Sequence, residues 1–164
     1  MYNRKFTVIG GDLRSIKLAE LIAEDGNEVN IYGFKKAGFE VSLNESEDLK
    51  SAIDESGVVI GPLPCSNDND TINAPFHDNK VYINEVFKIM SKNQLFIAGR
   101  ISDKIAHLAQ VYKVYSIDIL EREEMAVLNA IPTAEGAIQI AMEEMPITLH
   151  NSNAMILGFG RIGK

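Results

Sequence analysis

Cysteine is almost absent from this sequence: Cys65 is the only one, so no disulfide can form within the chain. A chain without disulfides is typical of a reducing compartment, and we expect a cytoplasmic location. No histidine lies near Cys65 in the sequence. We therefore interpret this residue as a small, partly buried side chain rather than as a nucleophilic thiol.

Basic residues are fewer than acidic ones: the chain has 16 Lys and Arg and 23 Asp and Glu, which gives a formal net charge of -7. Nucleic acids and anionic membranes favour a basic protein surface, so we expect neither as a partner. Long apolar runs are missing too, and the few apolar residues before Asp12 form neither a signal sequence nor a membrane span. His77, His107 and His150 are too scattered to suggest a metal site.

Short runs typical of strands alternate with helical patterns, which predicts an α/β fold. We expect a flavodoxin-like or Rossmann-like parallel sheet with helices on both faces. The strands are expected at residues 6–9, 28–32, 58–60, 94–98 and 111–117, with a further short one at 39–43. The helices are expected from Leu13 to before Gly26, then at 46–55, 86–90, 101–109, 121–130 and 134–145, the last two separated by Pro132.

The sequence closes on a glycine turn that follows an apolar run. Residues 153–157 are typical of a strand, and Gly158, Gly160 and Gly163 have the G-x-G-x-x-G spacing of a dinucleotide-binding turn that also contains Arg161. A chance turn is the alternative. We expect residues 1–150 to form a substrate-binding domain that ends in an interdomain helix. Residues 151–164 would then be the first strand and turn of a truncated NAD(P)-binding domain, the front part of a longer protein.

Glycine and arginine follow two of the predicted strands, at Gly11 and Arg14 and again at Gly99 and Arg100. We place both arginines in the first turn of a helix, where a guanidinium and free backbone N–H groups would hold a carboxylate together. These two positions predict a cradle for a small dicarboxylate. The alternative is that the arginines are solvated or paired with surface acids.

Two further segments are candidates for contact with a substrate. Residues 65–80 form a loop rich in Asn and Asp that we interpret as a functional lid, with Ser66 as a binding residue. Asn129, Thr133 and Glu135 precede or begin the last predicted helix. Thr133 can cap that helix, or all three residues can line a cleft between domains.

The first glycine pair, Gly10 and Gly11, could itself be a cofactor turn. Against this, the third glycine is missing, and the second predicted strand ends at Tyr32 and Gly33 with no acidic residue to bind a ribose. We therefore do not expect a nucleotide at this turn.

Taken together, these motifs resemble the A subunits of dipicolinate synthase from spore-forming bacteria. The resemblance rests on residues 8–12, 61–64, 98–100, 129–136 and 158–164, and it covers about the first half of such a protein. It implies an enzyme that oxidises a dihydrodipicolinate-type ring to dipicolinate with NADP or NAD, in the mother-cell cytoplasm during sporulation. It also implies that the B subunit of dipicolinate synthase is a partner. No catalytic residue can be carried over.

Two other functions stay open. The chain could be the substrate domain of another two-domain dehydrogenase, acting on a hydroxyacid or an amino acid, or a non-catalytic flavodoxin-like interaction module. In addition, an apolar strand without partners at residues 154–157 would be a template for pairing, which predicts a homo-oligomer formed by this chain.

Overall fold

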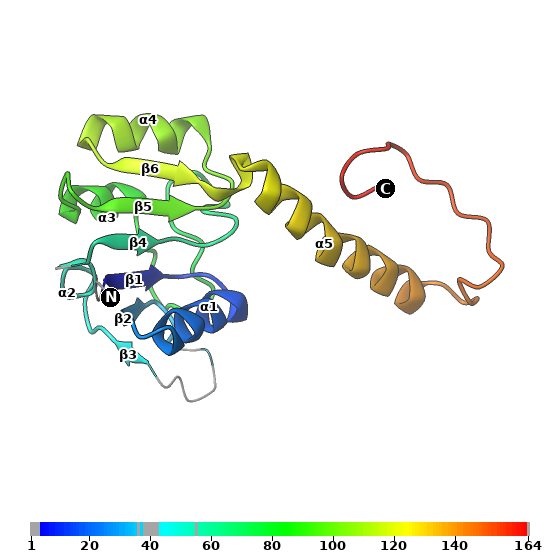
Figure 1. Ribbon diagram of the computed structural model, residues 1–164, viewed down its shortest axis with the longest axis horizontal. Coiled ribbons are helices and arrows are strands. Elements are labelled where there is room, and N and C mark those ends of the chain that lie inside the picture. Colours follow the sequence, from blue (N-terminus) through cyan, green and yellow to red (C-terminus); the bar gives the residue numbers. More distant parts are fainter. Residues whose placement is uncertain (1–3, 36, 38–42, 55, 164) are drawn as a thin grey trace. The chain divides into compact units, whose positions relative to one another are not determined.

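The computed structural model describes residues 4–35, 37, 43–54 and 56–163 (Figure 1). The chain divides into two compact units, the first ending at Ile119 and the second beginning at Leu120. The first unit contains the whole sheet, and the second contains one long helix followed by irregular chain.

The sheet of the first unit has six strands in the order β3-β2-β1-β4-β5-β6. Every neighbouring pair is parallel, which confirms the predicted parallel α/β fold. The order reverses between β1 and β4, as in doubly wound nucleotide-binding folds. The strands are β1 (Lys5–Ile9), β2 (Glu28–Tyr32), β3 (Asn44–Glu45), β4 (Val58–Ile60), β5 (Leu95–Ala98) and β6 (Tyr115–Asp118).

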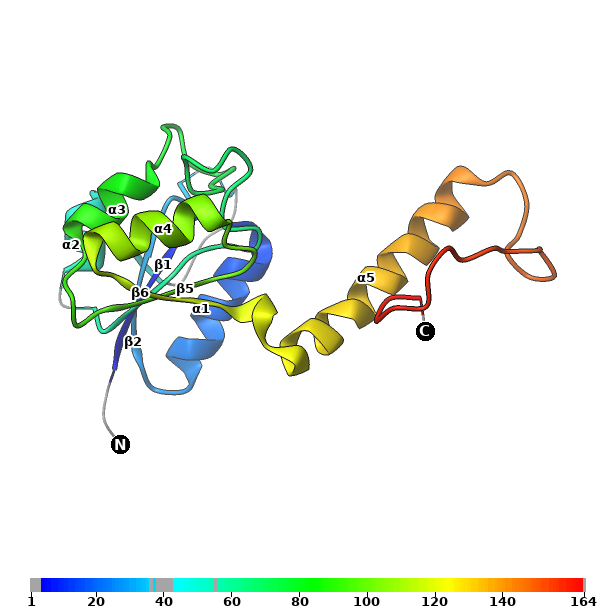
Figure 2. The ribbon, with the colours of Figure 1, turned by 90° about the horizontal axis from the view of Figure 1, so that it is seen from above.

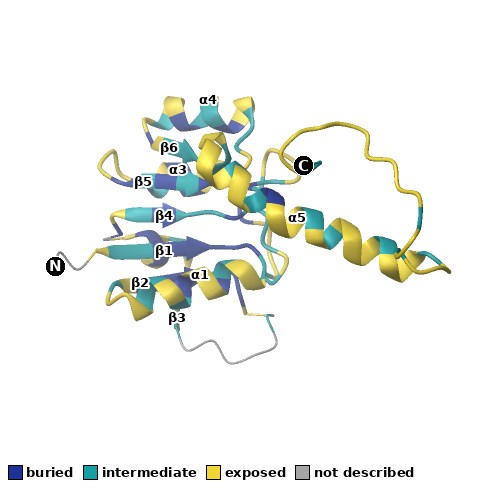
Figure 3. Cartoon of the chain, turned by 45° about the vertical axis from the view of Figure 1, so that its right-hand side comes forward, coloured by how far each residue is buried: buried dark blue, intermediate teal, exposed yellow. Residues whose placement is uncertain are grey.

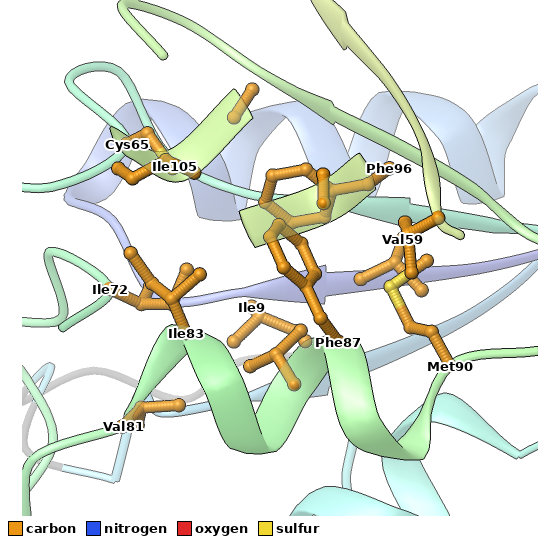
Figure 4. Close-up of a cluster of buried hydrophobic side chains, with 14 of the residues drawn as sticks. Ile9, Val59, Cys65, Ile72, Val81, Ile83, Phe87, Met90, Phe96 and Ile105 are labelled. Atoms are coloured by element: carbon orange, nitrogen blue, oxygen red, sulfur yellow. The ribbon is translucent and has the colours of Figure 1, made fainter. Parts of the chain in front are cut away.

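Helices cover both faces of this sheet (Figure 2). One lies on the first face, and its Ile16 and Ala19 pack against β1 and β2. The others lie on the opposite face and bury a larger cluster that contains Phe87 and Phe96 in edge-to-face contact, with ring centroids 5.0 Å apart (Figure 4). The helices are α1 (Leu13–Glu24) on the first face, and α2 (Leu49–Ile53), α3 (Ile83–Ile89) and α4 (Asp103–Tyr112) on the second.

Local capping fixes where several helices begin. The Asp12 carboxylate accepts the N–H of Arg14 at the start of α1, and the Ser102 hydroxyl caps α4. Helix α4 ends at Lys113, which has the left-handed conformation typical of a helix end. The prediction of a strand from residue 111 was therefore wrong, because those residues complete α4 and β6 begins only at Tyr115.

A buried polar network closes the short helix α2. Thr7, which is fully buried, hydrogen-bonds to the Ser56 hydroxyl and the Ala52 carbonyl. Gln94 donates to the carbonyls of Ile53 at 2.8 Å and Ser56 at 2.7 Å. The last carbonyls of a helix have no partner within it, so these side chains satisfy acceptors that burial would otherwise leave unpaired.

The second unit contains α5 (Glu123–Glu144), which follows the 3₁₀ turn η1 (Ile119–Glu121). The prediction of two helices was wrong, because α5 runs without interruption through Pro132. Proline removes one N–H from the helix. The Thr133 hydroxyl donates to a different carbonyl, that of Asn129 four residues back along the helix, at 2.7 Å. Thr133 thus lies inside the helix and does not cap it.

The predicted strand at residues 153–157 is not observed. Within residues 120–163 no strand is present, and Met155 and Leu157 are 85% and 91% exposed. A strand needs a neighbour for its backbone groups, and this unit offers none. The predicted strand at 39–43 falls almost wholly outside the described residues, and β3 follows at Asn44. Figure 3 shows the contrast in burial between the sheet and α5.

Candidate functional site

The carboxyl ends of β1 and β4 lie side by side where the strand order reverses. In open α/β sheets this point opens a crevice that receives ligands. Here the turns after β1, β4 and β5 meet around it. Together with the first turn of α1 they contain five of the predicted binding residues: Gly11, Arg14, Ser66, Gly99 and Arg100.

The crevice is filled by the chain itself. The loop of residues 66–80 folds over the turn after β1, and the N–H of Gly11 donates to the Asn73 carbonyl at 2.8 Å. A side chain at Gly10 would come within 3.0 Å of atoms of Ile72, Asn73 and Ala74. The backbone that a nucleotide phosphate would need to approach is thus already in contact with protein, and the expectation that Gly10 and Gly11 bind no cofactor stays a prediction.

The same loop does not have the character of a lid. The Asp68 carboxylate accepts the N–H groups of Asp70 and Thr71 at 2.9 and 2.8 Å, and these bonds hold its pKa well below the usual range. Lys104 pairs with Asp70 at 2.7 Å. Ser66 is part of this structure, since its hydroxyl accepts the N–H of Asn69 at 2.9 Å. The loop is therefore tied to its own turns and to α4.

A small polar cavity of about 270 Å³ lies within this loop. His77 lines it, and its buried Nδ1 has no hydrogen-bond partner among the described residues. The His77 ring lies 4.9 Å from the ring of Tyr32 at the end of β2. Across the described part of the chain, no group of three or more His, Cys, Asp and Glu side chains is arranged to bind a metal.

Arg14 lies in the first turn of α1, as predicted, but it is paired with a surface acid. Its Nε and Nη2 donate to the Asp12 carboxylate at 3.0 and 2.8 Å, which lowers the pKa of Asp12 and raises that of Arg14. The same Nη2 donates to the Leu63 carbonyl at 3.2 Å. Arg14 therefore links the turn after β1 to the turn after β4.

Arg100 was predicted to lie in the first turn of a helix, and that prediction was wrong. Helix α4 begins three residues later, and Arg100 has a φ of +58°, in the left-handed region. Its N–H donates to Asp118 Oδ1 at 3.0 Å, and the N–H of Ile101 donates to Asp118 Oδ2 at 2.6 Å. The N–H groups expected to hold a substrate carboxylate thus hold a carboxylate of the protein.

Asp118 is the residue that the sequence reasoning missed. It ends β6, where the rule that selected the other strand ends would also have selected it. The guanidinium of Arg100 is exposed, and it makes no ion pair or hydrogen bond with any other described residue. The arginine is therefore fixed at its backbone while its charge faces solvent.

Leu63 connects the two arginine turns. Its carbonyl accepts from Arg14, and its Cδ1 lies 2.5 Å from where a side chain at Gly99 would begin. Gly99 is also fixed by its backbone, which donates to Pro62 and accepts the N–H of Cys65 at 2.7 Å. Only glycine allows this close approach, so the turns after β1, β4 and β5 form one compact rim.

Cys65 lies beneath this rim in the core, with no exposed surface (Figure 4). Burial, and secondly the nearby charge of Asp118, raise the pKa of its thiol to about 12. The thiol is therefore neutral at physiological pH, which confirms its interpretation as a packing residue.

The remaining predicted residues belong to the second unit. Asn129 is half-buried on α5, and Thr133 and Glu135 are exposed on the same helix. Gly158, Gly160 and Gly163 form a turn without regular structure, and Arg161 pairs with Glu123 in the first turn of α5. Their contact with a substrate or cofactor stays a prediction.

None of the helices in the described part of the chain combines the length and the apolar composition needed to cross a bilayer. This holds for α5 as well, which has 22 residues.

Comparison with known proteins gives a consistent set of relatives. The family described as the N-terminal domain of the dipicolinate synthase A subunit matches residues 5–120. The A subunit of dipicolinate synthase from Bacillus subtilis (strain 168) is 27% identical over 164 residues, covering 97% of this chain and 54% of that protein. The crystal structure of the dipicolinate synthase A subunit from Bacillus halodurans has a TM-score of 0.82 at 20% identity, covering 98% of this chain and 56% of that one.

The crystal structure of the corresponding dipicolinate synthase protein from Bacillus subtilis is similar as well, with a TM-score of 0.78 at 22% identity. The match covers 99% of this chain and 55% of that chain. The chain thus spans about half the length of the relatives it matches, and the structural likeness supports the fold.

Proposed function

This chain belongs to the family of N-terminal domains of the dipicolinate synthase A subunit, and on that premise we propose that it is the substrate-binding part of an NAD(P)-dependent oxidoreductase. The reaction is the oxidation of a dihydrodipicolinate-type ring to pyridine-2,6-dicarboxylate. The gain of aromaticity drives it, and the protein supplies orientation and charge neutralisation.

The observation that carries this proposal is the state of Arg100. It lies at the carboxyl edge of the sheet, in a left-handed conformation that arginine rarely adopts, with its side chain exposed. Backbone strain of this kind clusters at binding sites. On a chain with a net charge of -7, a fixed cation at this edge offers one carboxylate of the substrate a two-point contact.

The second substrate carboxylate needs another donor, and Arg14 is the nearest candidate along the same rim. Its pairing with Asp12 weakens the case, because an incoming carboxylate would face the charge of that acid. We therefore assign Arg14 mainly a structural role, the hydrogen bond to the Leu63 carbonyl, and only secondly a role in binding the substrate. Ser66, Asn129, Thr133 and Glu135 remain proposed contacts for the ring or for a proton.

The nicotinamide cofactor, NADP or NAD, would take the hydride when bound. The glycine turn has one feature that fits it: Gly158 has a φ of +109°, a conformation open to glycine. Gly158, Gly160 and Gly163 would approach the pyrophosphate, with Arg161 beside them. The described residues include neither the helix that should follow nor a ribose-binding acid, so no step is assigned to the bound cofactor.

The family suggests a biological setting. We propose that the full-length protein works with the B subunit of dipicolinate synthase in the mother-cell cytoplasm of a sporulating bacterium. Nucleic acid and membrane have no part in this proposal.

Calorimetric titration of the full-length protein with pyridine-2,6-dicarboxylate tests the proposal. We expect saturable binding, and much weaker binding of lactate, which a hydroxyacid enzyme would prefer. Arg100→Lys should raise KM or lower turnover by about 10- to 100-fold, because lysine keeps the charge but not the planar two-point contact.

Arg4→Lys is the matched control. Arg4 is exposed and precedes β1, at the opposite end of that strand from the rim. This substitution should leave the kinetics unchanged. Failure of the wild-type protein to bind the dicarboxylate, or equal kinetics for Arg100→Lys and wild type, would contradict the assignment.

A further inference from the structure

We propose that Asp118 is a positioning residue, which holds Arg100 in its left-handed conformation and thereby aims the guanidinium at the substrate. This inference rests on the proposed function, because it gives Arg100 a carboxylate to bind. Asp118 itself is not expected to touch the substrate.

The sheet register explains how Asp118 reaches this place. Asp118, the last residue of β6, pairs with Ala98, the last residue of β5. Its carboxylate therefore extends sideways onto the chain that leaves β5. There it accepts the two successive N–H groups of Arg100 and Ile101 at 3.0 and 2.6 Å.

Two adjacent N–H groups can point at one carboxylate only if the backbone is bent around it. The φ of +58° at Arg100 produces that bend. For a residue with a β-carbon the left-handed conformation is unfavourable. The charge-assisted bonds to Asp118 offset this strain, so loss of the carboxylate should release Arg100 toward ordinary conformations.

The opposite side of the same turn is held independently. Gly99 is fixed to Pro62 by its N–H and to Cys65 by its carbonyl. Only the segment from Arg100 onward therefore depends on Asp118. A change at Asp118 should redirect the arginine without unfolding the rim.

A double-mutant cycle separates positioning from a merely structural role. The variants are Asp118→Asn, Arg100→Gly and the double variant, each made in the full-length protein. The probe is pyridine-2,6-dicarboxylate, with the dissociation constant measured by calorimetry and the melting temperature by circular dichroism. Glycine adopts the left-handed conformation freely, so Arg100→Gly removes the guanidinium without strain.

We expect Arg100→Gly to weaken binding by about 10- to 100-fold with no fall in melting temperature. Asp118→Asn should weaken binding about 10-fold in the wild-type background and not at all in the Arg100→Gly background. The matched control, Asp103→Asn in the first turn of α4, should leave affinity unchanged.

Equal losses from Asp118→Asn in both backgrounds would overturn the inference, and so would unchanged affinity in the wild-type background. If Asp118→Asn does not fold, Asp118→Glu keeps the charge but displaces it, and the same cycle applies. A wild-type protein that does not bind the dicarboxylate refutes the proposed function instead, so the two failures are distinguishable.

Discussion

The N–H of Gly11 donates to the carbonyl of Asn73 at 2.8 Å, and this bond joins the turn after β1 to the loop that follows β4. In dinucleotide-binding folds the corresponding N–H groups face a pyrophosphate. Here the same position is satisfied by a carbonyl oxygen, which is an acceptor that an anion would have to displace. The first unit thus shares its strand order with nucleotide-binding proteins but closes the crevice from within.

The 164-residue chain should accordingly bind NADPH poorly or not at all. Its first glycine turn is closed, and its second, at Gly158, has neither strands nor a following helix among the described residues. Titration with NADPH, followed by nucleotide fluorescence, measures this. Micromolar affinity would contradict the prediction and would return attention to Gly10 and Gly11.

Three glycines test how the backbone conformation contributes to stability. Gly11→Ala should destabilise the first unit most, because its φ is +98° and the new methyl group would lie 2.0 Å from Ser15 Oγ. Gly26 has a φ of +83° and open space around it, so Gly26→Ala creates no clash. Its only cost should be the backbone strain of alanine in that conformation, about 1 kcal/mol. Gly136→Ala, in α5 with nothing near it, should stabilise its helix by about 1 kcal/mol.

Urea unfolding of each variant, followed by circular dichroism, gives these differences. A cost at Gly11 no greater than at Gly26 would mean that Ser15 moves aside freely and that the turn is not tightly packed.

Much of the first unit could be predicted from the sequence because its signals are local. The apolar runs of β1, β2, β4 and β5 depend on neighbours in the chain, and these four strands lie within one residue of the predicted ranges. Pro132 was misread because the local rule ignores its surroundings. Proline in a helix interior costs about 3 kcal/mol, but α5 has 22 residues and contains many that favour a helix, such as Glu123, Ala126 and Ala137, and it continues through Pro132.

The candidate site was only partly predictable, because some of its contacts join residues that lie far apart in the sequence. The acid that occupies the donors after Gly99 is Asp118, 18 residues away from Arg100. Their contact depends on the register of β5 against β6, which sequence spacing does not reveal. For the same reason, the contact of Asn73 with Gly11 could not be anticipated from a loop rich in Asn and Asp.

Gln94 offers a stability test at the amino ends of β4 and β5. Its amide donates to the carbonyls of Ile53 and Ser56 and accepts the N–H of Ser91 at 2.7 Å. Gln94→Leu would leave these buried groups unpaired, so the free energy of unfolding should fall by about 2–4 kcal/mol. Gln139→Leu, an exposed glutamine on α5, should change it by less than about 0.5 kcal/mol. Similar effects of the two substitutions, measured by urea unfolding, would show that the network is not stabilising.

The Cys65 thiol should be unreactive in the folded protein, and its titration should lower the stability of the protein at alkaline pH. With no exposed surface and a pKa of about 12, the native thiol should react with a disulfide reagent at pH 8 far more slowly than in urea. The folded pKa is raised above the ordinary value of 9.0, so the stabilisation from the neutral thiol is complete below pH 9 and is lost as pH rises toward 12.

Cys65→Ala removes the titrating thiol and leaves a small cavity. The cavity should lower the free energy of unfolding by about 1–2 kcal/mol at pH 7. The stability difference between wild type and Cys65→Ala should therefore narrow between pH 9 and pH 11, because ionisation then favours only the unfolded wild-type chain. Rapid labelling of the native protein, or a difference that stays constant over this range, would mean that the thiol reaches solvent through the rim formed by the turns after β1, β4 and β5.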